Sequence, residues 1–201
     1  MKNKIILATL LYTSIATAQD DKKKIWFGQD FELGGGIINV AANESMMGDA
    51  HTAAPLSLFL KAGIFHYEQF TLGIHTNISG MRVKDPQYYG VFERTNTFTI
   101  GPYVSYFQPI SEELALEPYL SYDYTEYTAK SGRKELNFNA DGLGIGLDLQ
   151  YKAADNFFVL FGLKYTISTL DAKTHPDWQK YLHNYNFLSA KIAFKFAKYR
   201  F

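Results

Sequence analysis

The sequence predicts an all-β protein, an eight-stranded antiparallel up-and-down β-barrel that spans a membrane. Three observations lead to this fold class. Apolar and polar residues alternate with a period of two along most of the chain, which is typical of strands that place one face against an apolar environment. Aromatic residues make up 16% of the chain, with 15 Tyr and 16 Phe but only 6 Pro, which favours strands over helices. No stretch after the N-terminal segment is apolar for long enough to span a bilayer as a helix, so membrane entry would require a closed barrel.

The N-terminal segment has the three parts of a secretory signal peptide. Lys2 and Lys4 precede a short apolar stretch, and Ala16-Thr17-Ala18 provides a small-residue cleavage site. A buried N-terminal helix is the alternative, but the complete three-part pattern favours export and cleavage. The expected division of the chain is a cleaved signal peptide (1–18), a short periplasmic lead (19–24) and a transmembrane barrel domain (25–201).

Composition excludes several classes of function. The chain carries 20 basic and 20 acidic side chains without the clustered basic face that nucleic-acid binding needs. It has no cysteine, so disulfides and thiolate metal sites are impossible. His175 and His183 lack the spacing of zinc ligands on a rigid element, and no phosphate-binding glycine loop or zinc-protease motif occurs. We therefore expect no metal and no cofactor.

The alternation divides the chain into eight expected strands. They cover roughly residues 25–40, 54–67, 69–83, 94–109, 112–128, 135–152, 156–170 and 185–201. Three of the connections are tight turns and the other four are longer. Short turns on one rim and long loops on the other are typical of outer-membrane barrels, in which the short turns are periplasmic.

Some strands depart from strict alternation. Apolar residues lie on even numbers before Asp141-Gly142 and on odd numbers after it, which predicts a β-bulge there. The closing strand changes parity near Ala197, and either a bulge or fraying would account for it. Pro102 and Pro118 lie inside expected strands, where proline removes a ladder donor, so we expect local bulges or lost hydrogen bonds.

Alternation alone does not decide which face points inward, because a soluble lipocalin-like barrel would enclose a ligand with its apolar face. Glycine collects on the polar faces, as a crowded lumen would require: Gly28, Gly34, Gly36, Gly63, Gly73, Gly101, Gly144, Gly146 and Gly162. Aromatic residues gather near strand ends on the apolar faces: Phe27, Phe70, Tyr106, Tyr122, Tyr124, Tyr151, Phe157 and Tyr165. Such girdles lie at membrane interfaces. We therefore expect the polar faces to line the lumen.

This orientation places charged residues of both signs inside the barrel. The expected lumen residues are Asp30, Glu32, Lys61, Glu117, Asp123, Asp148, Lys164, Lys191 and Lys195. Buried charges must be paired or hydrated, so either a salt-bridge network or an ion or proton pathway would account for them. An eight-stranded interior is only wide enough for side chains, which favours the network.

The exported N-terminus, the eight strands, the alternating loop lengths and the final KIAFKFAKYRF resemble the small outer-membrane barrels of the OmpA/OmpX type. The composition resembles such proteins of Bacteroidota. The resemblance implies a place in the outer membrane of a Gram-negative cell, in contact with outer-membrane lipids and lipopolysaccharide. It also implies that Tyr199 and Phe201 form the recognition signal for the barrel assembly machinery. The parity change before Tyr199 departs from the usual pattern.

The segment GIHTNISG (73–80) carries the candidates for catalysis. His75, Asn77 and Ser79 share the polar face of one expected strand, and a serine nucleophile needs a base within hydrogen-bond reach. Some small outer-membrane barrels are lipid A hydrolases with a resembling H-x-S-N pattern, but here Asn77 stands two residues after His75. A hydrogen-bonded lumen histidine is the favoured interpretation.

The expected function is therefore that of an integral, non-enzymatic outer-membrane protein. Its role would be structural, or would lie in surface interactions through four exposed loops whose partner the sequence does not name. Two alternatives remain. One is an outer-membrane enzyme that modifies lipid A or phospholipid, and the other is a soluble periplasmic lipocalin-like carrier of an apolar ligand.

Overall fold

The computed structural model describes residues 25–40, 46–84, 92–132, 134–170 and 184–197. The expected signal peptide, the periplasmic lead, Tyr199 and Phe201 lie outside the described residues. Within the described ranges, no helix has both the length and the apolar character needed to cross a membrane.

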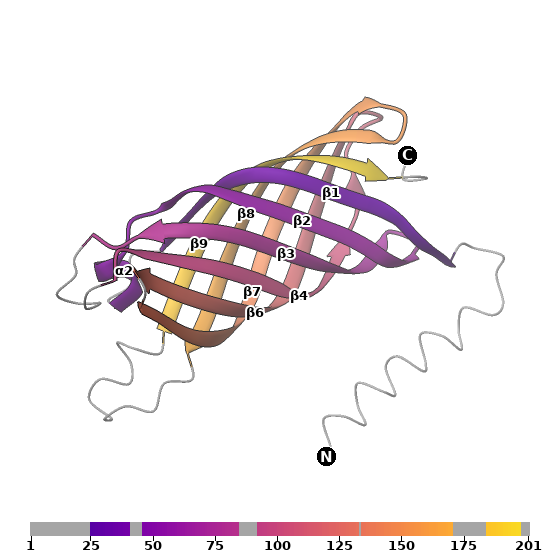
Figure 1. Cartoon of the computed structure of the whole chain (residues 1–201). Helices are drawn as coiled ribbons and strands as arrows, with labels where there is room; N and C mark the ends of the chain where they lie inside the picture. Colours follow the sequence, from indigo (N-terminus) through magenta and orange to yellow (C-terminus); the bar gives the residue numbers. More distant parts are fainter. Residues whose placement is uncertain (1–24, 41–45, 85–91, 133, 171–183, 198–201) are drawn as a thin grey trace, which may run out of the picture.

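The described chain forms one closed antiparallel sheet (Figure 1). Its elements are β1 (Ile25–Val40), α2 (Met46–Ala50), β2 (Ala54–Tyr67), β3 (Phe70–Arg82), β4 (Arg94–Tyr106), β5 (Gln108–Pro109), β6 (Leu114–Ser131), β7 (Lys134–Ala154), β8 (Phe157–Leu170) and β9 (Asn184–Ala197). Each long strand pairs with its neighbours in sequence, and β1 pairs with β9. The two-residue β5 extends the edge of β4 along β6. The predicted eight-stranded up-and-down barrel is thus confirmed.

The connections between the strands lie alternately at the two ends of the barrel (Figure 1). The tight β2–β3 and β7–β8 turns lie at one end and contain Glu68 and Asn156 with positive φ angles of 52° and 65°. Asparagine adopts this left-handed conformation more readily than most residues. The short helix α2 lies at the opposite end, within the β1–β2 connection. We call the end that carries α2 the loop end. One of the four connections expected to be longer, 129–134, is instead a tight turn at this end, because β6 and β7 stay paired up to Ser131 and Lys134.

The predicted bulge near Asp141-Gly142 is wrong. The register between β6 and β7 is continuous from Leu114↔Tyr151 to Ser131↔Lys134, and β8 pairs with β7 through the same region without a shift. The even-numbered face of β7 therefore points the same way throughout. Toward the loop end Ala140 is buried and the ring of Phe138 stacks on Tyr127 at a centroid distance of 4.9 Å, whereas Leu136 is exposed at the rim. Alternation predicted a bulge here because apolar side chains were expected to face outward, which Phe138 and Ala140 do not.

Register shifts occur elsewhere, near the ends of β1, β2 and β7. The β2–β3 pairing shifts between Gly63 and Phe65. Lys61 and Gly63 are buried before this shift, and His66 is buried after it. The shift thus turns His66 into the interior, where its Nδ1 lies 3.0 Å from Thr71 Oγ1.

The two prolines interrupt the ladder without changing its register. The pairs between β4 and β6 skip from Ile100↔Tyr124 to Tyr103↔Ser121, with Pro102 in the gap. A second gap, between Ser105↔Tyr119 and Gln108↔Leu116, faces Pro118. Both follow from the missing proline N–H. Of the two predicted outcomes, the structure shows lost ladder contacts rather than bulges.

Candidate functional site

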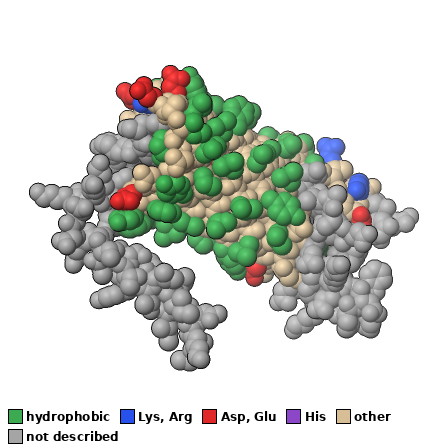
Figure 2. Space-filling view, turned by 180° about the vertical axis from the view of Figure 1, so that it is seen from behind, with side chains coloured by type: hydrophobic (Ala, Val, Ile, Leu, Met, Phe, Trp, Pro, Cys, Tyr) green, Lys and Arg blue, Asp and Glu red, His purple; other side chains and the backbone are tan. Residues whose placement is uncertain are grey.

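The barrel is polar inside and apolar outside. Along most of each strand, buried polar or small side chains alternate with exposed apolar ones. On β7, for example, Gly146 and Asp148 point inward while Leu143, Ile145 and Leu147 are 67%, 61% and 45% exposed. Figure 2 shows hydrophobic side chains over the middle of the wall and charged side chains toward its two ends. The interior is therefore where charged groups gather, and it is the candidate site.

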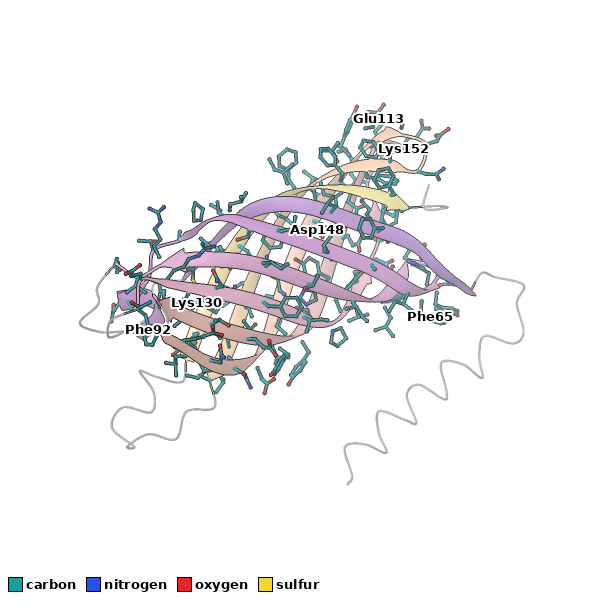
Figure 3. All side chains as sticks on the ribbon, viewed as in Figure 1. Phe65, Phe92, Glu113, Lys130, Asp148 and Lys152 are labelled. Atoms are coloured by element: carbon teal, nitrogen blue, oxygen red, sulfur yellow. The ribbon has the colours of Figure 1, made fainter. Side chains whose placement is uncertain are left out.

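The centre of the lumen holds two lysines and two carboxylates from four different strands. Lys61 Nζ lies 2.9 Å from Asp148 Oδ2 and 3.7 Å from Glu32 Oε2. Lys191 Nζ pairs with Glu32 and lies 3.2 Å from Asp148 Oδ1. Figure 3 shows Asp148 in the middle of the barrel. Each carboxylate contacts both ammonium groups, which offsets the cost of removing these charges from water.

A second group of charges lies toward the end with the short turns. Lys195 pairs with Glu117 and lies 3.2 Å from Asp30 Oδ2. Ser105 donates a hydrogen bond to Glu117 at 2.6 Å, and Gln150 donates another to the same carboxylate. The side chain of Glu117 is fully buried, and each of its two carboxylate oxygens has a hydrogen-bond or ion-pair partner.

A third group surrounds Asp123 toward the loop end. Lys164 Nζ lies 2.6 Å from Asp123 Oδ2, and His75 Nε2 lies 2.9 Å from Asp123 Oδ1. Thr166 donates a further hydrogen bond to Asp123 at 3.2 Å. These three partners come from strands β3 and β8, so the carboxylate of β6 ties together strands on opposite sides of the lumen.

Aromatic rings fill the space beside the central lysines. Lys61 Nζ lies 4.0 Å from the ring centroid of Tyr119 and 4.7 Å from that of Tyr103, within the range of cation–π attraction. Gly146 is the register partner of Tyr119, and a Cβ on Gly146 would lie 2.2 Å from the Tyr119 ring. Glycine on one strand therefore makes room for a tyrosine on the next.

All nine charged residues expected in the lumen lie inside, and each is within ion-pair distance of an opposite charge. We call this set, with His75, the lumen network. Four lysines and five carboxylates nearly balance. Such an arrangement cross-links strands that do not neighbour one another in the sheet. Among the described residues, few of the charged groups inside the barrel are exposed to solvent.

Apolar clusters flank the lumen network on both sides. Toward the loops, Met81, Tyr127, Leu170 and Tyr185 are buried together with several alanines. Toward the short turns, Phe158, Leu160, Ala193 and Ala197 form a second cluster. The interior is thus layered along the barrel axis, with charge in the middle and apolar packing nearer each end.

The three catalytic candidates are inside the barrel but do not form a catalytic group. His75 binds Asp123, Ser79 shares a hydrogen bond with Thr97, and Asn77 donates to the Leu58 carbonyl at 3.1 Å. His75 and Ser79 stand four residues apart on β3, which is about 13 Å along a strand. A serine nucleophile needs its base within hydrogen-bond reach, so this pair lacks that geometry.

Replacing Ser79 with alanine should lower the free energy of unfolding by about 1 kcal/mol, since a buried hydroxyl pair with Thr97 is lost. Thr52→Ala is the control because its hydroxyl bond to Arg82 is exposed, and its effect should stay within about 0.5 kcal/mol. Urea titration of the folded band on unboiled gels measures both. Equal effects would mean that Ser79 has no buried partner.

Sequence reasoning missed part of the interior. Tyr103, Tyr119 and Gln150 contact the lumen network, yet only charged residues were assigned to it. Their signal was present, because each occupies the polar face of its strand and Gly146 stands beside Tyr119. His66 could not be placed by alternation, because the shift after Gly63 reverses the parity.

Comparison with known proteins supports the fold and no more. No family model matches the chain, and no curated protein matches it. Among solved structures, Neisserial surface protein A (NspA) is 10% identical, with a TM-score of 0.59, over 87% of this chain and 99% of that one. Ail of Yersinia pestis is 12% identical, with a TM-score of 0.45, over 85% and 97%. OprG, an outer membrane protein of Pseudomonas aeruginosa, is 11% identical, with a TM-score of 0.47, over 85% and 96%.

Proposed function

We propose that the protein is an integral outer-membrane β-barrel with a closed lumen, whose role is structural or is carried by the connections at its loop end. The observation that carries this proposal is the reversed polarity of the barrel. Its outer wall exposes apolar side chains while its interior holds the lumen network. A wall of this kind is stable against lipid, where every backbone group must already be paired in a closed sheet.

The height of the apolar wall fits a bilayer. On β8 the outward-facing side chains from Phe157 to Ile167 are all aromatic or aliphatic. This segment covers about 33 Å of strand at about 3.3 Å per residue. With a tilt of about 40°, the apolar band is about 25 Å tall, which matches membrane barrels.

The interior argues against the soluble carrier. A lipocalin-like protein would enclose its ligand with apolar side chains, but here the lumen centre is occupied by paired charges. The enzyme alternative lacks support as well, because His75 points into the lumen and is bound to Asp123, whereas a lipid substrate would meet the outer wall. Recognition of the terminal Tyr199 and Phe201 by the barrel assembly machinery remains part of the proposal.

Fractionation and gel mobility test this proposal together. The mature protein should stay with outer membranes after carbonate washing, and its band should migrate differently before and after boiling. A barrel that dissolves in the periplasmic fraction without detergent would contradict it. Lipid A mass profiles should be the same with wild-type protein and with His75→Ala, since no catalytic geometry involves His75.

The closed lumen predicts an absence of channels in planar bilayers. Charged pairs occupy the centre, and apolar clusters lie nearer each end, of an interior that is only wide enough for side chains. Purified protein should therefore give no discrete conductance steps above those of detergent alone. Regular steps would instead support an ion pathway through the lumen network.

A further inference from the structure

Three cationic side chains form a lateral row on the outer wall at the loop end. Arg82 of β3 is the register partner of Arg94 of β4, and Arg94 is the partner of Lys130 of β6. All three are exposed. They point outward because the residues beside them, Met81, Thr95 and Ala129, are buried inside. We call these three residues the basic row. Adjacent strands lie about 4.8 Å apart, so the row is about 10 Å wide.

The sheet is not stabilised by this arrangement. Like charges placed directly opposite each other on neighbouring strands repel. Lys130 has an acidic partner, Glu135, at 3.4 Å. Neither arginine forms an ion pair with a carboxylate among the residues that the structure describes. Two adjacent guanidinium groups thus remain available to an anion, and an anion between them would remove the repulsion.

Gly80 directs one of these groups toward the apolar wall. Gly80 lies on the outward face of β3, two residues before Arg82. A Cβ on Gly80 would lie 2.8 Å from Nη2 of Arg94, with the rest of the guanidinium close behind. The arginine therefore folds back across the space that a side chain at position 80 would fill. This brings its charge about 7 Å along the strand toward the apolar wall, at about 3.3 Å per residue.

The level of the row corresponds to a lipid headgroup layer. Ile78 and Phe98 are paired, and they are the nearest large apolar residues below the row on β3 and β4. They stand four residues from Arg82 and Arg94, or about 10 Å along the axis of a barrel tilted by about 40°. Gly80 and its partner Asn96 lie between. A phosphate at the edge of the hydrocarbon layer would thus meet the guanidinium of Arg94 first.

We propose that the basic row binds a phosphate group of an anionic lipid in the outer leaflet, with the Arg94 guanidinium lying over Gly80 as its principal contact and Arg82 and Lys130 on either side. Arginine forms paired, charge-assisted hydrogen bonds to phosphate. The proposal rests on the membrane location proposed above. It adds a specific site on the outer wall, which is distinct from the lumen network.

The test uses the full mature barrel inserted into phosphatidylcholine nanodiscs that also contain lipid A. Native mass spectrometry then counts the lipid A molecules retained per barrel. Wild-type protein should retain phosphorylated lipid A in about tenfold excess over the same glycolipid without phosphates, as two charge-assisted contacts would give. The variant with Arg82→Gln, Arg94→Gln and Lys130→Gln should lose this preference.

Two further variants separate position from charge. Gly80→Ala keeps every charge but moves the Arg94 guanidinium, so it should reduce the preference several-fold. Lys152→Gln removes a lysine at the opposite end of the barrel (Figure 3) and should leave the preference unchanged. A triple variant that retains the wild-type preference would overturn the proposal, as would displacement of lipid A by millimolar inorganic phosphate, which would identify the ligand as the free ion.

The outcomes also separate this proposal from the membrane location. Insertion is scored independently, by resistance to carbonate and by the folded band on an unboiled gel. Failure of the wild type to insert would overturn both proposals. Insertion without any preference for the phosphorylated lipid would overturn the basic row alone.

Discussion

Replacing Lys61 with methionine should lower the free energy of unfolding by about 3–5 kcal/mol, the usual cost of removing one partner from a buried ion pair. Lys61 is 7% exposed, and its ammonium group lies between Asp148 and Glu32 and above the ring of Tyr119. Methionine fills a similar volume but leaves both carboxylates with Lys191 as their remaining ammonium partner. The midpoint of urea unfolding, measured from the folded band on unboiled gels, gives the change.

Lys130→Met is the matched control for this prediction. Lys130 forms an ion pair of 3.4 Å with Glu135, but both side chains are about half exposed. Exposed pairs contribute about 0–1 kcal/mol, so the same substitution should have little effect there. Equal destabilisation by the two variants would show that water reaches the lumen network freely and that Lys61 is not buried in the working protein.

Gly101→Ala should prevent formation of the folded barrel or destabilise it by about 3 kcal/mol or more. A Cβ at this position would lie 1.7 Å from the carbonyl oxygen of Tyr122 on the neighbouring strand. The obstruction is backbone, so no side-chain rotation can relieve it. Gly101 lies in the ladder gap caused by Pro102, where the two strands follow an irregular path. The yield of heat-modifiable protein after refolding into detergent measures the effect.

Gly35→Ala makes the same chemical change where space is available. Gly35 faces outward on β1, and a Cβ there would meet its nearest atom at 3.9 Å. This variant should refold with a yield and stability close to those of the wild type. If Gly101→Ala refolded equally well, the close approach of β4 and β6 at that point would be wrong.

Much of the fold could be predicted because a barrel wall imposes a simple rule on its sequence. Each side chain faces either lipid or the lumen, so period-two alternation located the strands and assigned Lys61, Asp123 and Asp148 to the interior. The rule failed where the lumen is apolar like the outer wall, because polarity then no longer distinguishes the two faces of a strand. At the loop end of β7 the interior is itself apolar, so Phe138 packs inside and the inferred bulge near Gly142 does not exist.

The pairings within the lumen network could not be predicted from the sequence. Which lysine meets which carboxylate depends on the register of strands that are far apart in sequence, as in Lys191 with Glu32. Register is set by turns and bulges. The register shift after Gly63 places His66 inside, and nothing in the residue pattern around it indicates the shift. The basic row could not be predicted for the same reason, because Arg82, Arg94 and Lys130 come together only through register.

A single cysteine tests most directly whether the apolar wall faces lipid. The chain has no native cysteine, so Leu147→Cys on the outer face of β7 can carry a polarity-sensitive dye in vesicles that contain nitroxide-labelled lipids. We expect blue-shifted emission that the nitroxide lipids quench, whereas the same dye on Glu113→Cys, at the end of the barrel (Figure 3), should emit as in water. Water-like emission from position 147 without quenching would contradict the membrane barrel.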